Sequence, residues 1–292
     1  MDRNLLKQSM TKTLILDGKA VAQARRAILS EKVAEFVKAK GRPPGLAVVI
    51  VGQDPASQIY VKNKVKACAE AGIASFHLEK PATLTQGELL KIIDELNSRA
   101  EVDGILVQLP LPKGLNETEA LERIKGEKDP DGLSSANLGL LIAGRTRVAP
   151  CTPLGVMKIF EHYKIEIAGK HAVVIGRSNI VGKPMAQLLL QANATVTMAH
   201  SKTHDLEAVT READIVVVAV GQRHLLGKSA FKKGVVIADV GMHRGEKGLC
   251  GDVRLEELHG WASAMTPVPG GVGPMTIQML LENTFRLAGG RI

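Results

Sequence analysis

A tyrosine and a lysine four positions apart are the first candidates for chemistry in this sequence. Tyr60 and Lys64 lie in a stretch with helical spacing, and residues at i and i+4 of a helix share one face. The adjacent, apolar face carries Val61, Val65 and Cys68. Lys64 is therefore expected beside apolar surface, where a partly desolvated amine loses its proton more easily and can act as an acid or base. For an isolated pair of this kind, a solvated lysine whose stem lies over Tyr60 is the alternative interpretation.

Two further polar groups lie in the same half of the chain. Gln108 ends the apolar run that begins at Gly104, so its amide is expected at the carboxyl edge of a strand, where open α/β sheets bind ligands. Such an amide can bind a heterocycle or orient Lys64, or it can simply cap a loop. Residues 129–132 read Asp-Pro-Asp-Gly, and turn chemistry alone explains both aspartates. An aspartate of this turn that faces a pocket can accept two N–H groups from an amino-pyrimidine edge.

A second centre of possible chemistry is the stretch over residues 172–184. Its apolar run breaks at Gly176, passes through Arg177 and Ser178, and enters a helix just after Gly182. Glycines in such a turn let backbone N–H groups and a helix N-terminus approach a pyrophosphate. The stretch therefore predicts a nucleotide-binding crossover. The loop departs from the usual G-x-G-x-x-G spacing, and taken alone it is equally compatible with a turn that binds no cofactor.

The residues after the next strand indicate which dinucleotide is bound. Residues 195–199 read as a strand and are followed by His200-Ser201-Lys202-Thr203. A NAD-selective site usually has an Asp or Glu at this place for the ribose hydroxyls. Here a hydroxyl and a cation take that place, Arg177 is available from the preceding loop, and no carboxylate repels a 2′-phosphate. The sequence therefore favours NADP over NAD, with a solvated basic loop as the alternative.

The elements that must position these residues alternate between helices and strands. In the first half we expect helices over 19–40, 57–71, 85–97 and 117–124, and strands over 46–51, 76–79 and 104–108. In the second half we expect a helix toward Tyr163, strands over 171–175, 195–199, 215–220, 235–240 and 262–266, and a final helix over 276–288. Thr85 and Glu88 predict a capping box, and Thr152-Pro153 predicts an N-cap followed by proline. Alternation of this kind predicts parallel sheets with right-handed crossovers. Residues 112–148 are otherwise expected to be loops.

Length and composition fit a soluble two-domain enzyme. A chain of 292 residues that is 45% hydrophobic can bury one large core or two modest ones. Aromatic residues make up only 3%, so Val, Ile, Leu and Ala must fill the core, as suits parallel α/β sheets. No apolar run approaches the ~20 residues of a membrane span. The first twelve residues lack the apolar segment of a secretory signal, and Met10 is an alternative start.

The net charge and the cysteines narrow the function classes further. A formal charge of +8 can indicate a nucleic-acid partner, but the basic residues take mixed helix positions without interleaved aromatics that would stack on bases. A solvated helix face and an anionic small-molecule substrate are the better interpretation. Cys68, Cys151 and Cys250 form no metal or redox motif. Each is expected to be a buried small apolar residue in a reducing cytosol.

Six segments, taken together, resemble one enzyme family. They are ASQIYVKNK ending at Lys64, DGILVQLPLP from Asp103, KDPDG from Lys128, PCTP from Pro150, VIGRSNIVGKP from Val174 and TPVPGGVGPMT from Thr266. In this order they are similar to the bifunctional methylenetetrahydrofolate dehydrogenase/methenyltetrahydrofolate cyclohydrolase family, over about residues 12–290. The strings QLPLP and PGGVGP are far more specific than any single motif above. The resemblance makes Lys64 the leading catalytic candidate.

The resemblance implies two consecutive reactions. The family oxidises 5,10-methylenetetrahydrofolate with NADP and then hydrolyses the methenyl cation to 10-formyltetrahydrofolate at the same site. By this resemblance, Lys64 is the acid/base of hydrolysis, Gln108 tunes it, and Asp131 holds the pterin. The folate-binding residues would be Tyr60, stacked on the aminobenzoate ring, together with Pro269, Gly270 and Gly271. The NADP-binding residues would be Gly176, Arg177, Ser178 and Ser201.

The resemblance also implies an α/β architecture of two domains with a cleft between them. A βαβ-type catalytic domain is expected over 12–150, completed by the C-terminal helix 274–292, and a Rossmann-like parallel-sheet NADP-binding domain over 151–273. A cytoplasmic homodimer is expected, acting in one-carbon steps of purine, histidine and methionine biosynthesis. No metal, nucleic acid or membrane partner is expected.

Two positions depart from the family pattern. Pro130 stands where the family usually has a β-branched residue, and because proline fixes φ and lacks an N–H, it can re-aim Asp131. Met242-His243 stands where other members often have Ile-Asn or similar, which touches the NADP contacts. Two alternatives to the family remain open at this point. One is another Rossmann oxidoreductase, of the shikimate or amino-acid dehydrogenase type, and the other is a basic nucleic-acid-binding module.

Overall fold

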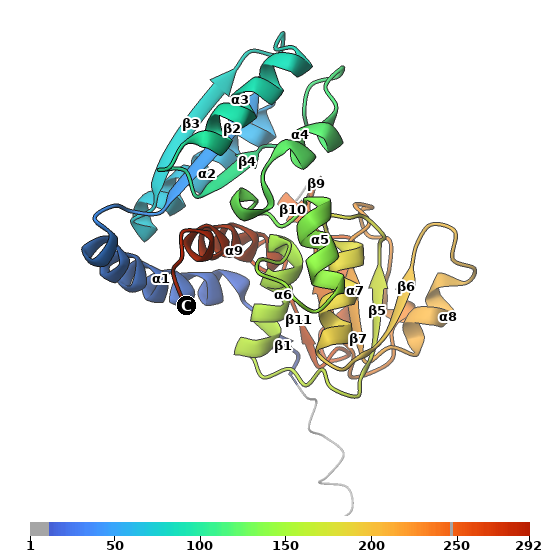
Figure 1. Cartoon of the computed structure of the whole chain (residues 1–292). Helices are drawn as coiled ribbons and strands as arrows, with labels where there is room; N and C mark the ends of the chain where they lie inside the picture. The colour runs from blue at the N-terminus through green and yellow to red at the C-terminus, as the bar shows by residue number, and fades with distance from the viewer. Residues whose placement is uncertain (1–11, 246–247) are drawn as a thin grey trace, which may run out of the picture. The chain divides into compact units, whose positions relative to one another are not determined.

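The computed structural model describes residues 12–245 and 248–292 (Figure 1). Met10, the alternative start, lies outside these residues. The chain forms two compact units. Unit 1 contains the described residues up to Lys19 together with Val156–Pro274, and unit 2 contains Ala20–Gly155 together with Met275–Ile292. No helix in the described part of the chain is long and apolar enough to cross a membrane.

Unit 1 is built on a six-stranded sheet in which every pairing is parallel. Its order is β1-β11-β8-β7-β5-β6. The strands are β1 (Leu14–Ile15), β5 (His171–Ile175), β6 (Thr195–Ala199), β7 (Ile215–Val218), β8 (Val236–Asp239) and β11 (Ala264–Met265). Strand β7 consists of buried Ile and Val, and Ala172–Ile175 of β5 and Ile237–Asp239 of β8 are buried as well, as expected for a sheet covered on both faces. The predicted parallel α/β fold is therefore confirmed for this unit.

The strand order of unit 1 reverses at β5. The chain continues from β5 to its neighbour β6, and then returns to pair β7 on the opposite side of β5. In open α/β sheets, ligands bind outside the carboxyl ends of the strands at such a switch point. Helix α7 (Gly182–Gln191) connects β5 to β6 and packs on both strands. Helix α8 (Leu206–Arg211) leads from β6 toward β7.

Unit 2 is built on a three-stranded parallel sheet of order β3-β2-β4. Its strands are β2 (Gly45–Val51), β3 (Ala74–Lys80) and β4 (Gly104–Val107). Helices α2 (Pro55–Ala71) and α3 (Gln86–Ser98) connect them, and Leu89, Ile93 and Leu96 of α3 belong to the core on the sheet. The capping box predicted for α3 is confirmed, because Thr85 and Glu88 bond each other's backbone N–H groups.

The remaining elements of the described residues belong to neither of these two parallel sheets. They are α1 (Gly18–Lys40), α4 (Glu117–Arg123), α5 (Ser135–Ile142), α6 (Cys151–His162), α9 (Val272–Leu287), the 3-10 turns Gly126–Lys128, Lys228–Ala230 and Leu255–Leu258, and the antiparallel pair β9 (His243–Gly245) and β10 (Gly248–Cys250). Most of the helices and strands expected from the sequence are present within a few residues of their predicted ends.

Three predictions about helices were wrong. Residues 135–142 were expected to be a loop but form α5, because the Ser134 hydroxyl caps its N-terminus by accepting from Asn137 N. Thr152 is not an N-cap, since α6 already begins at Cys151. Helix α9 begins at Val272, four residues before its predicted start, because a proline in the first turn, here Pro274, lacks only an N–H that has no partner in the helix.

Candidate functional site

Lys64 is a buried amine with one defined partner. It lies on α2 with only 9% of its surface exposed. Its Nζ donates a hydrogen bond of 2.9 Å to Oε1 of Gln108, the residue that follows β4. The Gln108 amide is itself fixed, because its Nε2 donates to the Leu109 carbonyl at 2.6 Å. The orientation of the amide therefore keeps its oxygen toward the lysine.

Burial changes the acidity of the groups around Lys64. Loss of solvent lowers the pKa of Lys64, and the nearby Asp131 carboxylate opposes that shift. Burial raises the pKa of Asp131, and the Lys64 ammonium opposes it. Tyr60, one turn before Lys64 on α2, is half-buried, and burial raises the pKa of its phenol. The structure thus brings Lys64, Gln108 and Asp131 together around an amine that releases its proton more readily than a solvated lysine.

The two aspartates of the turn at 129–132 differ in their bonding. Asp129 is buried, and its carboxylate accepts from Gly132 N at 2.9 Å, Ser134 N at 2.8 Å and Asn137 Nδ2 at 2.9 Å. Asp129 therefore holds the turn and the start of α5. Asp131 remains partly accessible to solvent and interacts with Lys64. Asp129 is thus occupied by three donors, whereas Asp131 contacts Lys64 and Cys151 and keeps some exposed surface.

Asn283, which the sequence did not single out, and Cys151, which it predicted only to be buried, hold the backbone before Asp131. Asn283 on α9 is fully buried, and its Nδ2 donates to the carbonyls of Pro130 at 2.8 Å and Ala149 at 3.0 Å. The Cys151 thiol donates to the same Pro130 carbonyl at 3.3 Å. Burial raises the pKa of this thiol well above its ordinary value, so it stays protonated. No signal in the sequence distinguishes Asn283, because Gln278, Glu282 and Thr284 of the same helix are also polar residues that become fully buried.

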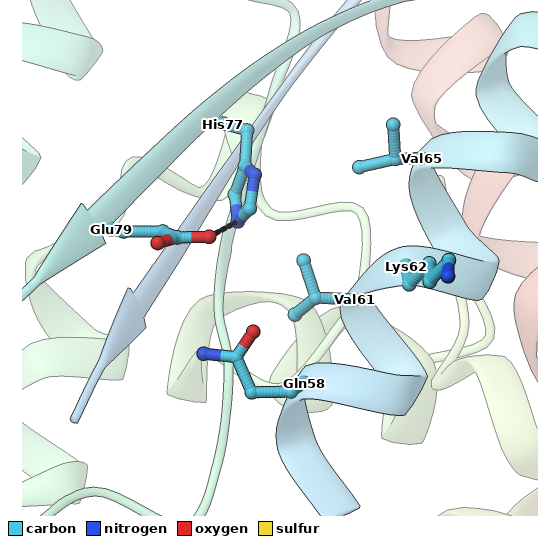
Figure 2. A pocket seen from close by; sticks show the side chains of 6 residues that line it. All are labelled: Gln58, Val61, Lys62, Val65, His77 and Glu79. Carbon is cyan, nitrogen blue, oxygen red and sulfur yellow. Dashed lines mark ion pairs between the residues drawn. The ribbon is translucent and has the colours of Figure 1, made fainter. Parts of the chain in front are cut away.

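A cavity of about 400 Å³ opens at a different face of α2. Figure 2 shows its lining: Gln58, Val61, Lys62 and Val65 from α2, with His77 and Glu79 from β3. The His77 ring and the Glu79 carboxylate lie 3.6 Å apart. The cavity contains neither Lys64 nor its partners. Its titratable residues, Lys62, His77 and Glu79, are exposed, so it lacks the desolvated acid/base group that the Lys64 site has.

The carboxyl edge of the six-stranded sheet fits a dinucleotide. Gly176 follows β5 directly with φ +126°, and a Cβ there would collide with the Ala219 carbonyl. A Cβ on Gly182, the first residue of α7, would in turn collide with the Gly176 carbonyl. The Ser178 hydroxyl accepts from Val181 N at 3.1 Å and fixes the loop before α7. These glycines let a tight backbone loop lie beside a helix N-terminus, the arrangement that binds pyrophosphates.

The neighbouring strand brings the second group of predicted cofactor residues to the same edge. Ile175 of β5 pairs with Ala199 of β6, so Arg177 and Ser201 follow adjacent parallel strands. Both residues are exposed. No Asp or Glu stands at residues 199–203, and the first carboxylate after them, Asp205, accepts from Ala208 N as the cap of α8. The tip of β6 therefore leaves room for a 2′-phosphate.

The glycines predicted to bind folate near α9 have a role in packing. Gly270 has φ +99°, and its carbonyl accepts from Lys19 N at 2.8 Å. A Cβ on Gly271 would collide with the Pro267 carbonyl, and a Cβ on Gly18 would collide with that of Gly271. The peptide bond before Pro269 is cis. These contacts place the start of α1 against the loop within unit 1. Contact with folate by Pro269, Gly270 and Gly271 stays a prediction.

Comparison with known proteins gives consistent matches along the whole chain. The model of the tetrahydrofolate dehydrogenase/cyclohydrolase catalytic domain matches residues 16–131, and that of the NAD(P)-binding domain matches residues 150–291. The chain is 58% identical over 277 residues to the bifunctional protein FolD of Bdellovibrio bacteriovorus, which covers 94% of this chain and 96% of that relative.

Two solved structures are similar throughout their length. The bifunctional methylenetetrahydrofolate dehydrogenase/cyclohydrolase of Campylobacter jejuni has a TM-score of 0.92 and 50% identity, covering 95% of this chain and 99% of that one. The enzyme of Trypanosoma brucei, solved with NADP and an inhibitor, has a TM-score of 0.90 and 41% identity, covering 94% and 97%.

Proposed function

The chain belongs to the tetrahydrofolate dehydrogenase/cyclohydrolase family, and from this premise we propose which of its residues perform each reaction. It is a bifunctional enzyme of folate one-carbon metabolism: it oxidises 5,10-methylenetetrahydrofolate with NADP and hydrolyses the product to 10-formyltetrahydrofolate. Family membership decides against the other Rossmann oxidoreductases and the nucleic-acid-binding module considered above.

Lys64 is the proposed acid/base of hydrolysis, and its burial beside Gln108 carries this proposal. The neutral amine takes a proton from the water that attacks the methenyl carbon. The resulting ammonium returns that proton to the departing folate nitrogen as the carbon–nitrogen bond breaks, and the second proton of the water leaves to solvent. Burial supports the role, because it lowers the pKa of Lys64 and general bases work best with a pKa near the operating pH.

Gln108 is proposed to tune Lys64 because its amide is neutral. The amide oxygen accepts from Nζ at 2.9 Å and orients the amine in either protonation state. A carboxylate at this distance would favour the ammonium strongly and would raise the pKa of Lys64. Asp131 is proposed to bind the amino-pyrimidine edge of the pterin, since the other aspartate of the turn is occupied by the backbone. Tyr60 is proposed to stack on the aminobenzoate ring from the same helix as Lys64.

NADP is proposed to bind at the carboxyl edge of β5 and β6. Gly176 and Ser178 would hold the pyrophosphate, and Arg177 and Ser201 would hold the 2′-phosphate. When bound, NADP accepts the hydride that leaves the methylene carbon. The protein residues supply position and charge for this step and no strong base, so Lys64 matters mainly for hydrolysis. The predicted ligand assignment, folate to residues 12–150 with 274–292 and NADP to 151–273, is part of this proposal.

Purified protein tests the function directly. With methylenetetrahydrofolate and NADP we expect NADPH and methenyltetrahydrofolate to form first, followed by 10-formyltetrahydrofolate, each followed by its absorbance. Added methenyltetrahydrofolate alone should be hydrolysed faster than in buffer. Absence of NADPH formation, or hydrolysis at the buffer rate, would contradict the proposal for that reaction.

We also propose, from family membership, that the enzyme is a cytoplasmic homodimer whose products serve purine, histidine and methionine biosynthesis. Its measured mass by light scattering should be twice the 31.2 kDa of the chain. A monomer mass at working concentration would contradict the dimer. Fractionation of cells that express the protein tests the compartment.

A further inference from the structure

Two buried carboxylates in unit 1 have no part in the proposed reactions. Asp239 ends β8 with 1% of its surface exposed, and Asp252 follows β10 with none exposed. A buried carboxylate is costly unless hydrogen bonds satisfy it, so both must have structural or functional partners. Two glycines make room for them: a Cβ on Gly251 would collide with the Asp239 carboxylate, and a Cβ on Gly241 would collide with that of Asp252.

Asp239 holds the backbone that carries Asp252. Its carboxylate accepts from Gly241 N at 2.9 Å, Asp252 N at 3.0 Å and Val253 N at 2.9 Å. Burial raises the pKa of Asp239 to about 6, against the effect of these backbone donors. The Asp239 backbone is itself anchored, because its N–H donates to the Thr266 hydroxyl at 2.9 Å. The position of Asp252 is therefore set by the end of a central strand.

Asp252 in turn holds the segment that follows β7. Its Oδ2 accepts from Val220 N at 2.9 Å and from Gly221 N at 3.0 Å. Its Oδ1 lies 2.7 Å from Nε2 of His243 on β9, which must be the donor because a carboxylate only accepts. One carboxylate thus joins three segments: residues 219–221, β9 and its own turn.

Residues 219–221 lie at the switch point of the sheet. Ala219 N donates to the Ile175 carbonyl at 2.8 Å, and the Ala219 carbonyl occupies the space that a side chain on Gly176 would need. Gly221 has φ +66°, is exposed, and has open space beside its Cα. The segment therefore borders the glycine loop on the side where open α/β sheets bind ligands.

We propose that Asp252, held in place by His243, is a positioning residue for NADP binding: it fixes residues 219–221 beside the Gly176 loop. This inference rests on the proposed placement of NADP at that edge. An asparagine at this position has one acceptor oxygen instead of two, so it cannot accept from the two backbone N–H groups and from His243 together, as the carboxylate does. The segment can then take other conformations that do not fit the dinucleotide.

The two activities of the enzyme separate this role from a merely structural one. Hydrolysis of methenyltetrahydrofolate, measured without NADP, needs no bound dinucleotide. For Asp252→Asn we expect the KM for NADP to rise roughly tenfold, the lower end of what a hydrogen bond to a charged group contributes, with the hydrolysis rate and the KM for methylenetetrahydrofolate unchanged. His243→Ala should give a severalfold rise, and His243→Gln, which keeps a donor, should restore most of the affinity.

Asp214→Asn is the matched control. The Asp214 carboxylate lies just before β7, at the amino end of the same strand, and accepts from His171 N at 2.9 Å and Lys232 Nζ at 2.7 Å. Loss of the Asp214 carboxylate should lower the midpoint temperature of thermal unfolding, while the KM for NADP stays at the wild-type value. If Asp252→Asn does not fold, the two His243 variants carry the test.

An unchanged KM for NADP in Asp252→Asn, or an equal fall in both activities, would overturn the inference. So would equal effects of His243→Ala and His243→Gln. Arg177→Ser in the same assays tests the proposed cofactor site separately from the role of Asp252. If Arg177→Ser raises the KM for NADP and Asp252→Asn does not, the proposed cofactor site stands and only the role of Asp252 fails.

Discussion

The proposed acid/base site in unit 2 and the proposed cofactor edge in unit 1 treat their basic side chains in opposite ways. Lys64 is 9% exposed and bonded to a neutral amide, whereas Arg177 is exposed on a loop that the Ser178 hydroxyl fixes. A group that must exchange a proton near neutral pH needs an altered pKa, which burial provides. A group that binds a phosphate must stay charged and reachable, and solvent keeps it so. The residue proposed to exchange a proton is therefore buried, and the residue proposed to bind the cofactor phosphate is exposed.

Replacing Lys64 by methionine should have the largest effect, because it removes the proposed proton carrier and keeps the length of the side chain. We expect hydrolysis of methenyltetrahydrofolate to fall by about 10²–10⁴-fold, the usual contribution of general acid–base catalysis, with a much smaller loss of dehydrogenase activity and folate affinity. Lys62→Met, an exposed lysine on the same helix, is the control and should keep both activities. Equal loss of both activities in Lys64→Met would contradict the proposal that Lys64 acts mainly in hydrolysis.

Replacing Arg177 by serine should affect the binding of NADP and leave hydrolysis unchanged. Loss of the guanidinium should raise the KM for NADP by about 10–100-fold, the value of a hydrogen bond to a charged group. The KM for NAD and the rate of hydrolysis should stay unchanged. Lys170→Ser is the control, since Lys170 precedes β5 at the opposite end of the strand and pairs with Glu166. A parallel rise in the KM for NAD would show that Arg177 does not read the 2′-phosphate.

Two substitutions should move the pH profile of hydrolysis in opposite directions. If neutral Lys64 is the base, the rate rises as the pH passes through the Lys64 pKa. Asp131→Asn removes a charge that raises this pKa, so the rise should move to lower pH. Gln108→Glu places a carboxylate 2.9 Å from Nζ, so the rise should move to higher pH. Rates at saturating folate over a pH series check both shifts, and shifts of the same sign would exclude Lys64 as the titrating group.

The smallest effect should come from a change that alters stability alone. Thr85→Ala removes the cap of α3 and should lower the free energy of unfolding by ~1 kcal/mol, measured by urea denaturation. Both kcat and both KM values should stay at the wild-type level, because α3 carries none of the proposed site residues. Thr83→Ala, at an exposed threonine two residues earlier, is the control for loss of a hydroxyl. A change in either activity would mean that lower stability alone reduces activity, so that the kinetic losses of the other variants would include this contribution.

The features that the sequence predicted well are local. Strand β2 is a continuous run of apolar residues and glycine, β5 is apolar after His171, and the capping box of α3 is a pattern of four residues. The Lys64 environment followed from helical spacing, since the apolar positions beside it fix which face is buried. The parallel order of both sheets followed from strand–helix alternation.

The features that the sequence did not predict depend on distant partners. Strand β1 is two residues long and exists because it pairs with β11, about 250 residues later in the chain. The choice between Asp129 and Asp131 depends on backbone donors at 132 and 134 that only the folded turn presents. Asn283 acts on a carbonyl 153 positions away. Spacing along a single element carries no information about such contacts.

The hydrogen bonds from Asn283 to the Pro130 and Ala149 carbonyls have a consequence for synthesis of the protein. Unit 2 begins with Ala20–Gly155 but is completed by α9, where Phe285 packs its ring against Phe36. A ribosome must synthesise all of Val156–Pro274 before that helix emerges, which takes on the order of ten seconds at typical elongation speeds. During this interval the nascent first half exposes the apolar surface that α9 later covers. The turn that presents Asp131 therefore gains its hydrogen bond from Asn283 only after Val156–Pro274 have been synthesised.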